Sequence, residues 1–306
     1  HAATSRREPY ASFASTIAEM TPSQTPSFKD PSEYKIVGTH KPRRDIPAKV
    51  DGSLKFALDV RLPGMLFASV VRSPVSGGSI VNVNDSAAQA IEGVVDVIVI
   101  PESSVDSMLG ATISGEAVAV VADSYWTANR ALQELSVQWS ETGFESVSSD
   151  DIFAQFDRDI SSRRDRQTDR LEGEADSVFS TAAKVIDADY HVPYLAHTCM
   201  EPLNATADVR NGRAEVWVGC QNPLGFRRDV ANVLGLDEEN VMLHNHAMGG
   251  GFGRKSRPDY AIQAAQLAQA MGRPVQLIWS REEDVRQDFY RPAVQSRFRA
   301  AFDADN

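Results

Sequence analysis

The chain has 306 residues, enough for two domains of ordinary size, and carries 31 basic against 42 acidic side chains, a net charge of −11. This balance argues against a nucleic acid or an anionic membrane surface as the partner, because either would need a cationic face. No run of 18 apolar residues is present, so the sequence predicts no membrane-spanning helix. The residues from His1 to Tyr10 are polar, and we expect no signal peptide there.

The first 140 residues divide into an extended leading segment, 1–32, and a small α+β domain, 33–140. Residues 10–18 predict a short helix, and three prolines between 21 and 31 predict an extended linker after it. In the domain, apolar runs predict strands, and capping residues before periodic segments predict helices. The strands are expected at 54–60, 65–71, 94–100 and 117–121, and the helices at 85–91 and 123–135. No cluster of titratable residues indicates chemistry here, and we interpret this domain as scaffold.

A solvated, charged connector, 141–178, is expected to lead into a second domain, 179–306. Asn211-Gly212 between two β-rich runs predicts a hairpin. The predicted strands are 185–192, 204–210, 213–219, 241–246 and 275–279, and the predicted helices, 223–234 and 258–271, each end at a glycine. Residues 296–303 alternate as a half-buried strand with no predicted partner, so we expect the chain to stop inside this domain.

Metal-ligating side chains are few and scattered. Cys199 and Cys220 are too few for a disulfide framework or an iron–sulfur cluster, and we interpret them as small buried apolar residues. No cysteine or histidine group has zinc spacing, and the paired histidines of 191–197 and 244–246 lack a third ligand. The sequence therefore predicts no direct metal ligand from the protein.

The most informative motif is the glycine cluster in Met248-Gly-Gly-Gly-Phe-Gly-Arg-Lys255. It fits neither the dinucleotide fingerprint nor the P-loop pattern. It nevertheless follows a predicted strand and precedes a helix, where glycines permit positive φ and leave main-chain N–H groups free to face an anion. Arg254 and Lys255 would add charge for an oxyanion. The candidate binding residues are Gly249, Gly250, Gly251, Phe252, Gly253 and Arg254; the alternative is a flexible turn.

Gln221 is the second candidate, because it follows strand 213–219 at the carboxyl end, where ligands gather in α/β sheets. A glutamine amide there can donate a hydrogen bond to an oxo group without adding charge. The alternative is a glutamine at the start of a helix that faces water.

Together with three further stretches, the glycine cluster resembles the large subunits of molybdenum hydroxylases, the xanthine dehydrogenase/aldehyde oxidase family. Residues 46–66 and 118–128 resemble the opening and the end of the family's hammerhead domain, and Met200-Glu-Pro-Leu-Asn resembles its Glu-Pro segment. Gly253-Arg-Lys and Asp288-Phe-Tyr-Arg-Pro are similar to the isoquinoline 1-oxidoreductase β-subunit branch, which includes exported aldehyde dehydrogenases.

The resemblance implies an α+β fold, a hammerhead-type domain followed by part of a molybdopterin-binding domain. It implies molybdopterin cytosine dinucleotide with molybdenum as cofactor, and oxidation of an aldehyde or N-heteroaromatic substrate with water as the oxygen source. Electrons would pass to [2Fe-2S] clusters in a small partner subunit. The branch implies a periplasmic location, with the cytoplasm as the alternative. Two alternative hypotheses are a non-catalytic anion-binding module and a purely structural piece of a larger complex.

By the same resemblance, Gln221 would hydrogen-bond an oxo ligand, and Arg291 falls near a substrate-orienting arginine of purine-oxidising relatives. Ser256 stands where that branch carries a carboxylate, which argues against xanthine. No residue of the chain matches the family's catalytic glutamate, so the resemblance places the general base outside it, and we interpret Glu201 as structural. We therefore expect the chain to be an inactive internal part of a larger subunit.

Overall fold

The computed structural model describes residues 4–107, 110–162 and 167–305 and divides into two compact units, 1–53 and 54–306. The first unit holds short helices joined by extended chain. They are η1 (Tyr10–Phe13), α1 (Ala14–Ala18), η2 (Pro31–Glu33) and α2 (Ile46–Val50). The predicted helix at 10–18 is therefore confirmed, and η2 begins where the Asp30 carboxylate accepts a hydrogen bond from the Ser32 amide at 2.9 Å.

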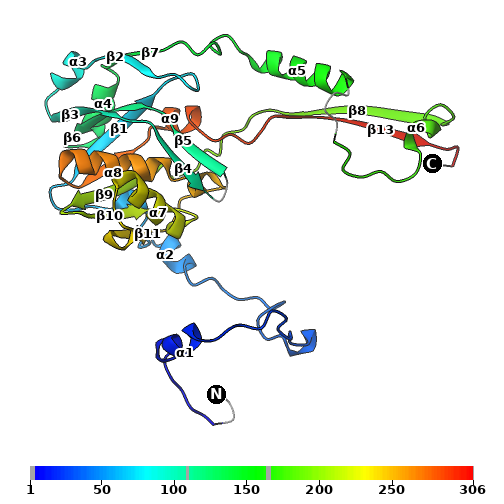
Figure 1. Cartoon of the computed structure of the whole chain (residues 1–306), viewed down its shortest axis with the longest axis horizontal. Helices are drawn as coiled ribbons and strands as arrows, with labels where there is room; N and C mark the ends of the chain where they lie inside the picture. Colours follow the sequence, from blue (N-terminus) through cyan, green and yellow to red (C-terminus); the bar gives the residue numbers. More distant parts are fainter. Residues whose placement is uncertain (1–3, 108–109, 163–166, 306) are drawn as a thin grey trace. The chain divides into compact units, whose positions relative to one another are not determined.

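The second unit is built on one seven-stranded mixed sheet (Figure 1). In spatial order its strands are β11 (Val241–Asn245), β10 (Arg213–Val218), β9 (Asn204–Arg210), β12 (Val275–Ile278), β1 (Leu66–Arg72), β6 (Ala117–Ala122) and β3 (Val94–Ile100). β10 is parallel to β11 and β1 is parallel to β12, whereas every other neighbouring pair is antiparallel. The sheet thus joins strands from both predicted domains, and the α+β class is confirmed.

The continuous apolar run of β6 follows from its place in this sheet. All six of its side chains are buried, because helices cover both faces. Alternate residues Ala117, Ala119 and Val121 share a core with α7 (Pro223–Leu234) and α8 (Asp259–Met271). Val120 instead packs with α3 (Ser86–Gln89) and α4 (Tyr125–Leu132) on the opposite face. A strand buried on both sides has no polar alternation, which is why its sequence reads as Ala-Val-Ala-Val-Val-Ala.

Local turn chemistry behaves as predicted in the second half of the chain. Asn211 and Gly212 adopt φ of 53° and 71° in the β9–β10 turn, the left-handed values that a two-residue hairpin requires. α7 and α8 end at Gly235 and Gly272, both left-handed. Further short elements of this half are η4 (Glu238–Asn240), η5 (Arg254–Ser256) and α9 (Arg281–Arg286).

The strand predicted at 54–60 is wrong. Phe56 forms one isolated bridge, and η3 (Ala57–Asp59) follows it. The Asp59 carboxylate accepts a hydrogen bond from the Phe56 amide at 3.0 Å, and the Arg61 guanidinium donates to the Leu58 carbonyl at 2.8 Å. These local side-chain contacts satisfy main-chain groups that a strand would need for its ladder.

Three two-stranded ribbons are found in the described part of the second unit. They are β2 (Ile80–Asn84) with β7 (Ser136–Trp139), β4 (Ser103–Ser107) with β5 (Gly110–Ser114), and β8 (Lys184–Val192) with β13 (Val294–Phe302). The last pairing corrects the prediction that the strand at 296–303 has no partner, since β13 pairs antiparallel with β8 from Val294↔Val192 to Phe302↔Lys184. The two strands lie about a hundred residues apart, so no local pattern reveals their pairing.

The predicted connector contains the helices α5 (Ser149–Ser162) and α6 (Ala175–Val178), which the sequence analysis did not anticipate. Its basic stretch 163–166 lies outside the described residues. Within the described ranges, no helix is long and apolar enough to cross a membrane.

Candidate functional site

Four loop segments meet at one edge of the large sheet because of its strand directions. β10 and β11 run parallel, so the segments after them, 219–222 and 246–258, leave at the same edge. β9 is antiparallel to β10, which places the segment that precedes it, 195–203, at this edge too. β12 is antiparallel to β9, and its carboxyl end leads into 279–292 there. The sheet therefore gathers Gln221, the glycine cluster, Glu201 and Arg291 at one edge.

The glycine cluster forms a tight loop with an unusual backbone. Gly250 and Gly253 adopt φ of 101° and 105°, which L-side chains rarely reach. Phe252 also has a positive φ, 53°, a strained value for a bulky residue, and its side chain is 76% exposed. A Cβ atom at Gly251 would lie 2.7 Å from Gln221 Oε1, so only glycine fits at that position. The backbone is thus held close to Gln221.

Gln221 lies directly beside this loop. Its main-chain N–H donates to the Lys255 carbonyl at 2.9 Å, and its side-chain Oε1 accepts a hydrogen bond from the main-chain N–H of Gly253 at 3.0 Å. No acceptor for the side-chain Nε2 of Gln221 is found among the described residues. Gln221 therefore lies beside the glycine cluster, and an N–H donor remains for a ligand.

The main-chain N–H groups of the loop fall into two classes. Those of Gly249 and Gly253 donate to the side chains of Glu201, at 2.8 Å, and Gln221. For the consecutive amides of Gly250, Gly251 and Phe252, no acceptor is found among the residues that the structure describes. A short run of main-chain donors with no protein acceptor is the arrangement that binds an anion or an oxo group.

Arg254 and Lys255 correct the sequence prediction, because neither charge is directed at a ligand. The Arg254 guanidinium makes a two-pronged pair with Asp259, at 2.9 and 2.8 Å, and its Nε lies 3.0 Å from Asp288 Oδ1. Lys255 Nζ lies 2.7 Å from Glu201 Oε2. Both cationic side chains are only 1% exposed, so their charges are neutralised beneath the loop.

Glu201 has the structural role predicted for it. It accepts hydrogen bonds from the Lys255 ammonium, the Gly249 amide and, at 3.3 Å, the Leu58 amide. Burial opposes its ionisation, but the Lys255 ammonium and the Gly249 N–H outweigh burial and hold the pKa of Glu201 below its ordinary value. An ionised carboxylate with these partners fixes the loop rather than transferring protons.

The two cysteines are both buried, as predicted, and unpaired. The Cys199 thiol lies 3.5 Å from the Gly251 carbonyl, and burial raises the pKa of Cys220 to about 12. Burial also raises the pKa of Cys199, so neither thiol is activated. Across the described part of the chain, no three His, Cys, Asp or Glu side chains gather as a metal site.

A cavity of about 610 Å³ opens beside the loop. Its lining is mainly apolar and comprises Leu195, Ala196, His197, Phe252, Phe289, Tyr290, Arg291 and Pro292. Arg291 is held there by its backbone, whose amide donates to the Leu195 carbonyl at 2.9 Å. Phe252 from the glycine cluster and Arg291, the predicted substrate residue, thus line one cavity.

His197 is a polar residue of this cavity that the sequence analysis did not single out. Its Nδ1 lies 3.0 Å from both carboxylate oxygens of Asp288. The two residues are 91 positions apart, so no spacing rule could pair them. In the sequence, the one feature that points to His197 is its position shortly before Met200-Glu-Pro-Leu-Asn, the segment that carries part of the family resemblance.

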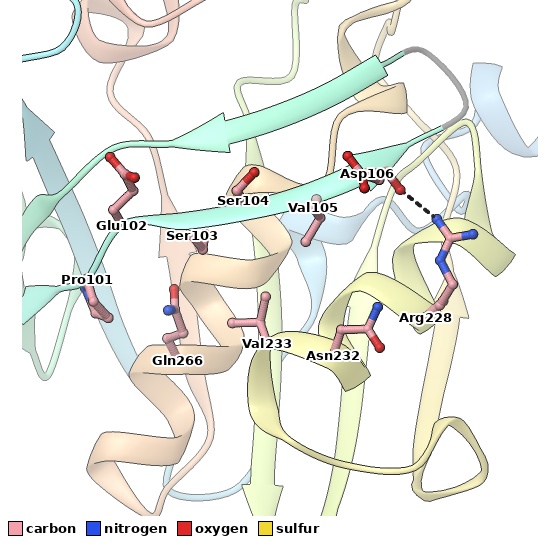
Figure 2. A pocket seen from close by; sticks show the side chains of 10 residues that line it. All are labelled: Pro101, Glu102, Ser103, Ser104, Val105, Asp106, Arg228, Asn232, Val233 and Gln266. Carbon is pink, nitrogen blue, oxygen red and sulfur yellow. Dashed lines mark hydrogen bonds between the residues drawn. The ribbon is translucent and has the colours of Figure 1, made fainter.

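A second cavity, of about 720 Å³, lies between the β4–β5 ribbon and the helices α7 and α8 (Figure 2). Figure 2 shows Arg228 reaching across it to donate to the Asp106 carbonyl at 3.1 Å. None of the residues predicted from the sequence to bind a ligand lines this cavity. We therefore take the cavity beside the glycine cluster as the candidate site.

Comparison with known families agrees with this geometry. Residues 159–306 match the molybdopterin cofactor-binding domain, and residues 51–143 match the a/b hammerhead domain of aldehyde oxidase and xanthine dehydrogenase. The chain belongs to the aldehyde oxidase and xanthine dehydrogenase family. The glycine cluster and Gln221 lie in the segment of this family member that matches the cofactor-binding domain.

Individual family members extend the match over most of the chain. The isoquinoline 1-oxidoreductase β-subunit of Brevundimonas diminuta is 31% identical over 90% of the chain, which spans 34% of that relative. A membrane-bound aldehyde dehydrogenase (pyrroloquinoline-quinone) of Gluconacetobacter polyoxogenes is 32% identical over 96% of the chain and 39% of the relative. The chain therefore spans between a third and two fifths of these two relatives.

Among solved structures, quinoline 2-oxidoreductase of Pseudomonas putida 86 superimposes with a TM-score of 0.65 at 24% identity. The match covers 88% of this chain and 38% of that one. At this identity the likeness establishes the fold alone.

Proposed function

We propose that this chain is part of the molybdenum-cofactor-binding subunit of an oxidoreductase, and that the glycine loop with Gln221 contacts the cofactor. The observation that carries the proposal is the run of three amides, Gly250 to Phe252, without a protein acceptor beside a glutamine with a spare N–H donor. Such a set of neutral donors suits the oxo and phosphate groups of a molybdopterin cofactor. When bound, that cofactor supplies the two-electron oxidation of a carbon centre, with oxygen from water.

The residues present also hold the loop in the conformation that offers these amides. Gly249 and Gly251 have no room for a side chain. A Cβ at Gly249 would lie 2.5 Å from the Glu201 side chain, and one at Gly251 would lie 2.7 Å from that of Gln221. The main chain at these glycines is therefore packed directly against the two side chains, which holds the loop's N–H groups in place. Arg254 would not contact an anionic ligand. It would support the loop through its ion pairs with Asp259 and Asp288.

The chain's own residues would bind and orient the substrate. The rings of Phe252, Phe289 and Tyr290 wall the cavity, which suits a flat aromatic aldehyde or N-heteroaromatic compound and excludes water from its apolar side. Arg291 adds a cation at the rim for an electronegative substituent. The names of the two relatives, an isoquinoline oxidoreductase and an aldehyde dehydrogenase, support the same two substrate classes.

Three finer assignments belong to this proposal. We assign the cytosine dinucleotide form of the cofactor, a small [2Fe-2S] partner subunit as electron acceptor, and a periplasmic location with the cytoplasm as the alternative. The designation of one relative as a β-subunit supports a multi-subunit assembly, and the membrane-bound relative supports a location at the cell envelope. The general base is assigned outside this chain, because Glu201, the carboxylate beside the loop, is paired with Lys255.

The test is molybdenum content and dye-linked oxidation of benzaldehyde and isoquinoline by the assembled protein. Gln221→Ala is expected to lower turnover at least tenfold, on the order of a lost donor to developing charge, with little change in the unfolding midpoint. Gly251→Val is expected to abolish metal loading because its side chain intrudes on Gln221. Gln133→Ala, at the exposed end of α4, is the matched control. A metal-free wild-type assembly, or full turnover in Gln221→Ala, contradicts the proposal.

A further inference from the structure

His197 is held in one orientation by its neighbours. Its Nδ1 lies 3.0 Å from both Asp288 oxygens, and its own amide also donates to that carboxylate. Asp288 is 1% exposed and is paired on its other side with Arg254 Nε at 3.0 Å. The next residue, Thr198, has a φ of 45°, a strained value for a β-branched side chain. A ring fixed by a buried carboxylate and a strained backbone is a preorganised group.

The carboxylate also determines which ring nitrogen is a donor. An ionised aspartate only accepts hydrogen bonds, so the proton of a neutral His197 is on Nδ1, and Nε2 carries a lone pair. Nε2 lies 3.6 Å from the position that a Cβ of Gly253 would take, next to the glycine loop. Among the described residues, no hydrogen-bond partner for Nε2 is found. The His197 side chain, which is one of those lining the cavity, is 19% exposed.

The walls around this acceptor are aromatic. Phe252 projects from the loop, and Phe289 is held with its ring under the guanidinium groups of Arg254 and Arg257, each 5.0 Å from its centroid. The Tyr290 hydroxyl lies 2.7 and 2.9 Å from the Val285 and Arg286 carbonyls, and its one proton is donated to this pair of acceptors. Its ring rather than its hydroxyl therefore serves the cavity. The cavity thus combines flat apolar surfaces with one oriented hydrogen-bond acceptor.

We propose that His197 is a positioning residue of this cavity, and that its Nε2 accepts a hydrogen bond from an N–H or O–H group on a flat aromatic ligand. Asp288 fixes the tautomer, and Arg254 holds Asp288 in place. This assignment rests on the proposed function for the identity of the ligand as substrate or product. It gives the pair Arg254–Asp288 a role in specificity beyond stabilising the loop.

The experiment compares two ligands that differ in one donor. Isoquinolin-1(2H)-one carries a ring N–H, and its N-methyl derivative does not. Equilibrium binding of both is measured by calorimetry on the assembled protein, with molybdenum content and unfolding midpoint recorded for each variant. His197→Phe removes the acceptor and keeps a flat ring, and His197→Gln restores an amide acceptor. His191→Phe is the matched control, because His191 stacks on Phe153 away from this cavity.

The wild type is expected to bind the N–H compound about fivefold more tightly than the N-methyl compound, the contribution of one neutral hydrogen bond. His197→Phe should lower this ratio by that factor, His197→Gln should recover part of it, and His191→Phe should leave it unchanged. Asp288→Asn offers an N–H to Nδ1, turns Nε2 into a donor and should also abolish the preference.

An equal ratio in the wild type and His197→Phe overturns the proposal, as does binding of neither compound by a folded wild type. If His197→Phe does not fold, Asp288→Asn decides by the same criterion, because it too is expected to abolish the preference. Molybdenum content separates the two hypotheses: a metal-free assembly that keeps the ligand preference contradicts the proposed function and leaves the role of His197 standing.

Discussion

Ion pairs of similar length occur in two very different settings in this protein. At the glycine-loop edge the paired side chains are almost fully enclosed. They are Arg254 with Asp259 and Asp288, and Lys255 with Glu201, none more than 7% exposed. On the β8–β13 ribbon, the pairs Arg297–Asp189 and Arg299–Asp187 are between 33% and 61% exposed. Judged by distance alone, the ion pairs of the two regions would contribute equally to the free energy of unfolding. Their different burial makes these contributions unequal.

The physical reason is the surrounding dielectric. Water screens the ribbon pairs, and each gains little over its two separated, hydrated partners. The loop pairs have lost their hydration and depend on each other, so removal of one partner leaves an unpaired buried charge. The loop edge therefore depends on its ion pairs, and the ribbon does not.

The sharpest way to break this contrast is Arg254→Ala. It leaves the carboxylates of Asp259 and Asp288 buried without their cation, and the cost is expected to be about 3–5 kcal/mol of unfolding free energy. Urea denaturation of the assembled protein at neutral pH measures it. A loss of less than about 1 kcal/mol would place Arg254 in the same class as the ribbon arginines.

Glu283 sharpens the contrast, because it is a buried carboxylate with no ion pair among the residues that the structure describes. It is 3% exposed, accepts a hydrogen bond from the Arg72 amide at 2.9 Å, and burial raises its pKa from 4.5 to about 7. The folded state holds this proton more tightly than the unfolded chain, so stability falls as pH rises from 4.5 to about 7.

The variant Glu283→Gln keeps the acceptor and removes the titration. Its unfolding free energy is expected to lack this decline, a difference from the wild type on the order of 3 kcal/mol between pH 4.5 and 8. Thermal unfolding across that range is the measurement. If the unfolding free energies of the two proteins change with pH in parallel, the proposed titration of Glu283 is wrong.

The smallest expected effect is on the ribbon. Arg299→Ala removes a pair with Asp187 and a guanidinium lying 4.6 Å from the Phe179 ring centroid, both in contact with water. We expect a loss below about 1 kcal/mol, reduced further in 0.5 M salt. A salt-independent loss comparable to that of Arg254→Ala would remove the distinction between the two regions.

Features determined by neighbouring residues were predictable from the sequence. The Asn211-Gly212 turn, the glycine ends of α7 and α8, and the continuous apolar run of β6 follow from backbone and packing rules that act over a few residues. The positions of Gln221 and of the glycine cluster after strands were also predicted, whereas the parallel pairing of those two strands, β10 and β11, comes from the structure.

Contacts between distant segments were not predictable in this way. The β8–β13 pairing, the enclosure of Arg254 by Asp288, and the His197–Asp288 contact each join residues that no periodicity relates. Charge adjacent to the glycine loop suggested anion binding. The carboxylates that neutralise Arg254 come from α8 and the segment after α9, and the one that neutralises Lys255 comes from the segment before β9. The predicted domain boundary at 141–178 stays a prediction.

The order of strands in the large sheet has a consequence for the integrity of the chain. β1 is inserted between β12 and β6, so the amino-terminal strands are hydrogen-bonded to a strand more than two hundred residues later. The core cluster likewise draws side chains from both sides of the exposed 141–148 segment. A proteolytic nick there would sever a covalent link that the folded state does not need. The two pieces should co-elute in gel filtration and separate only in denaturant.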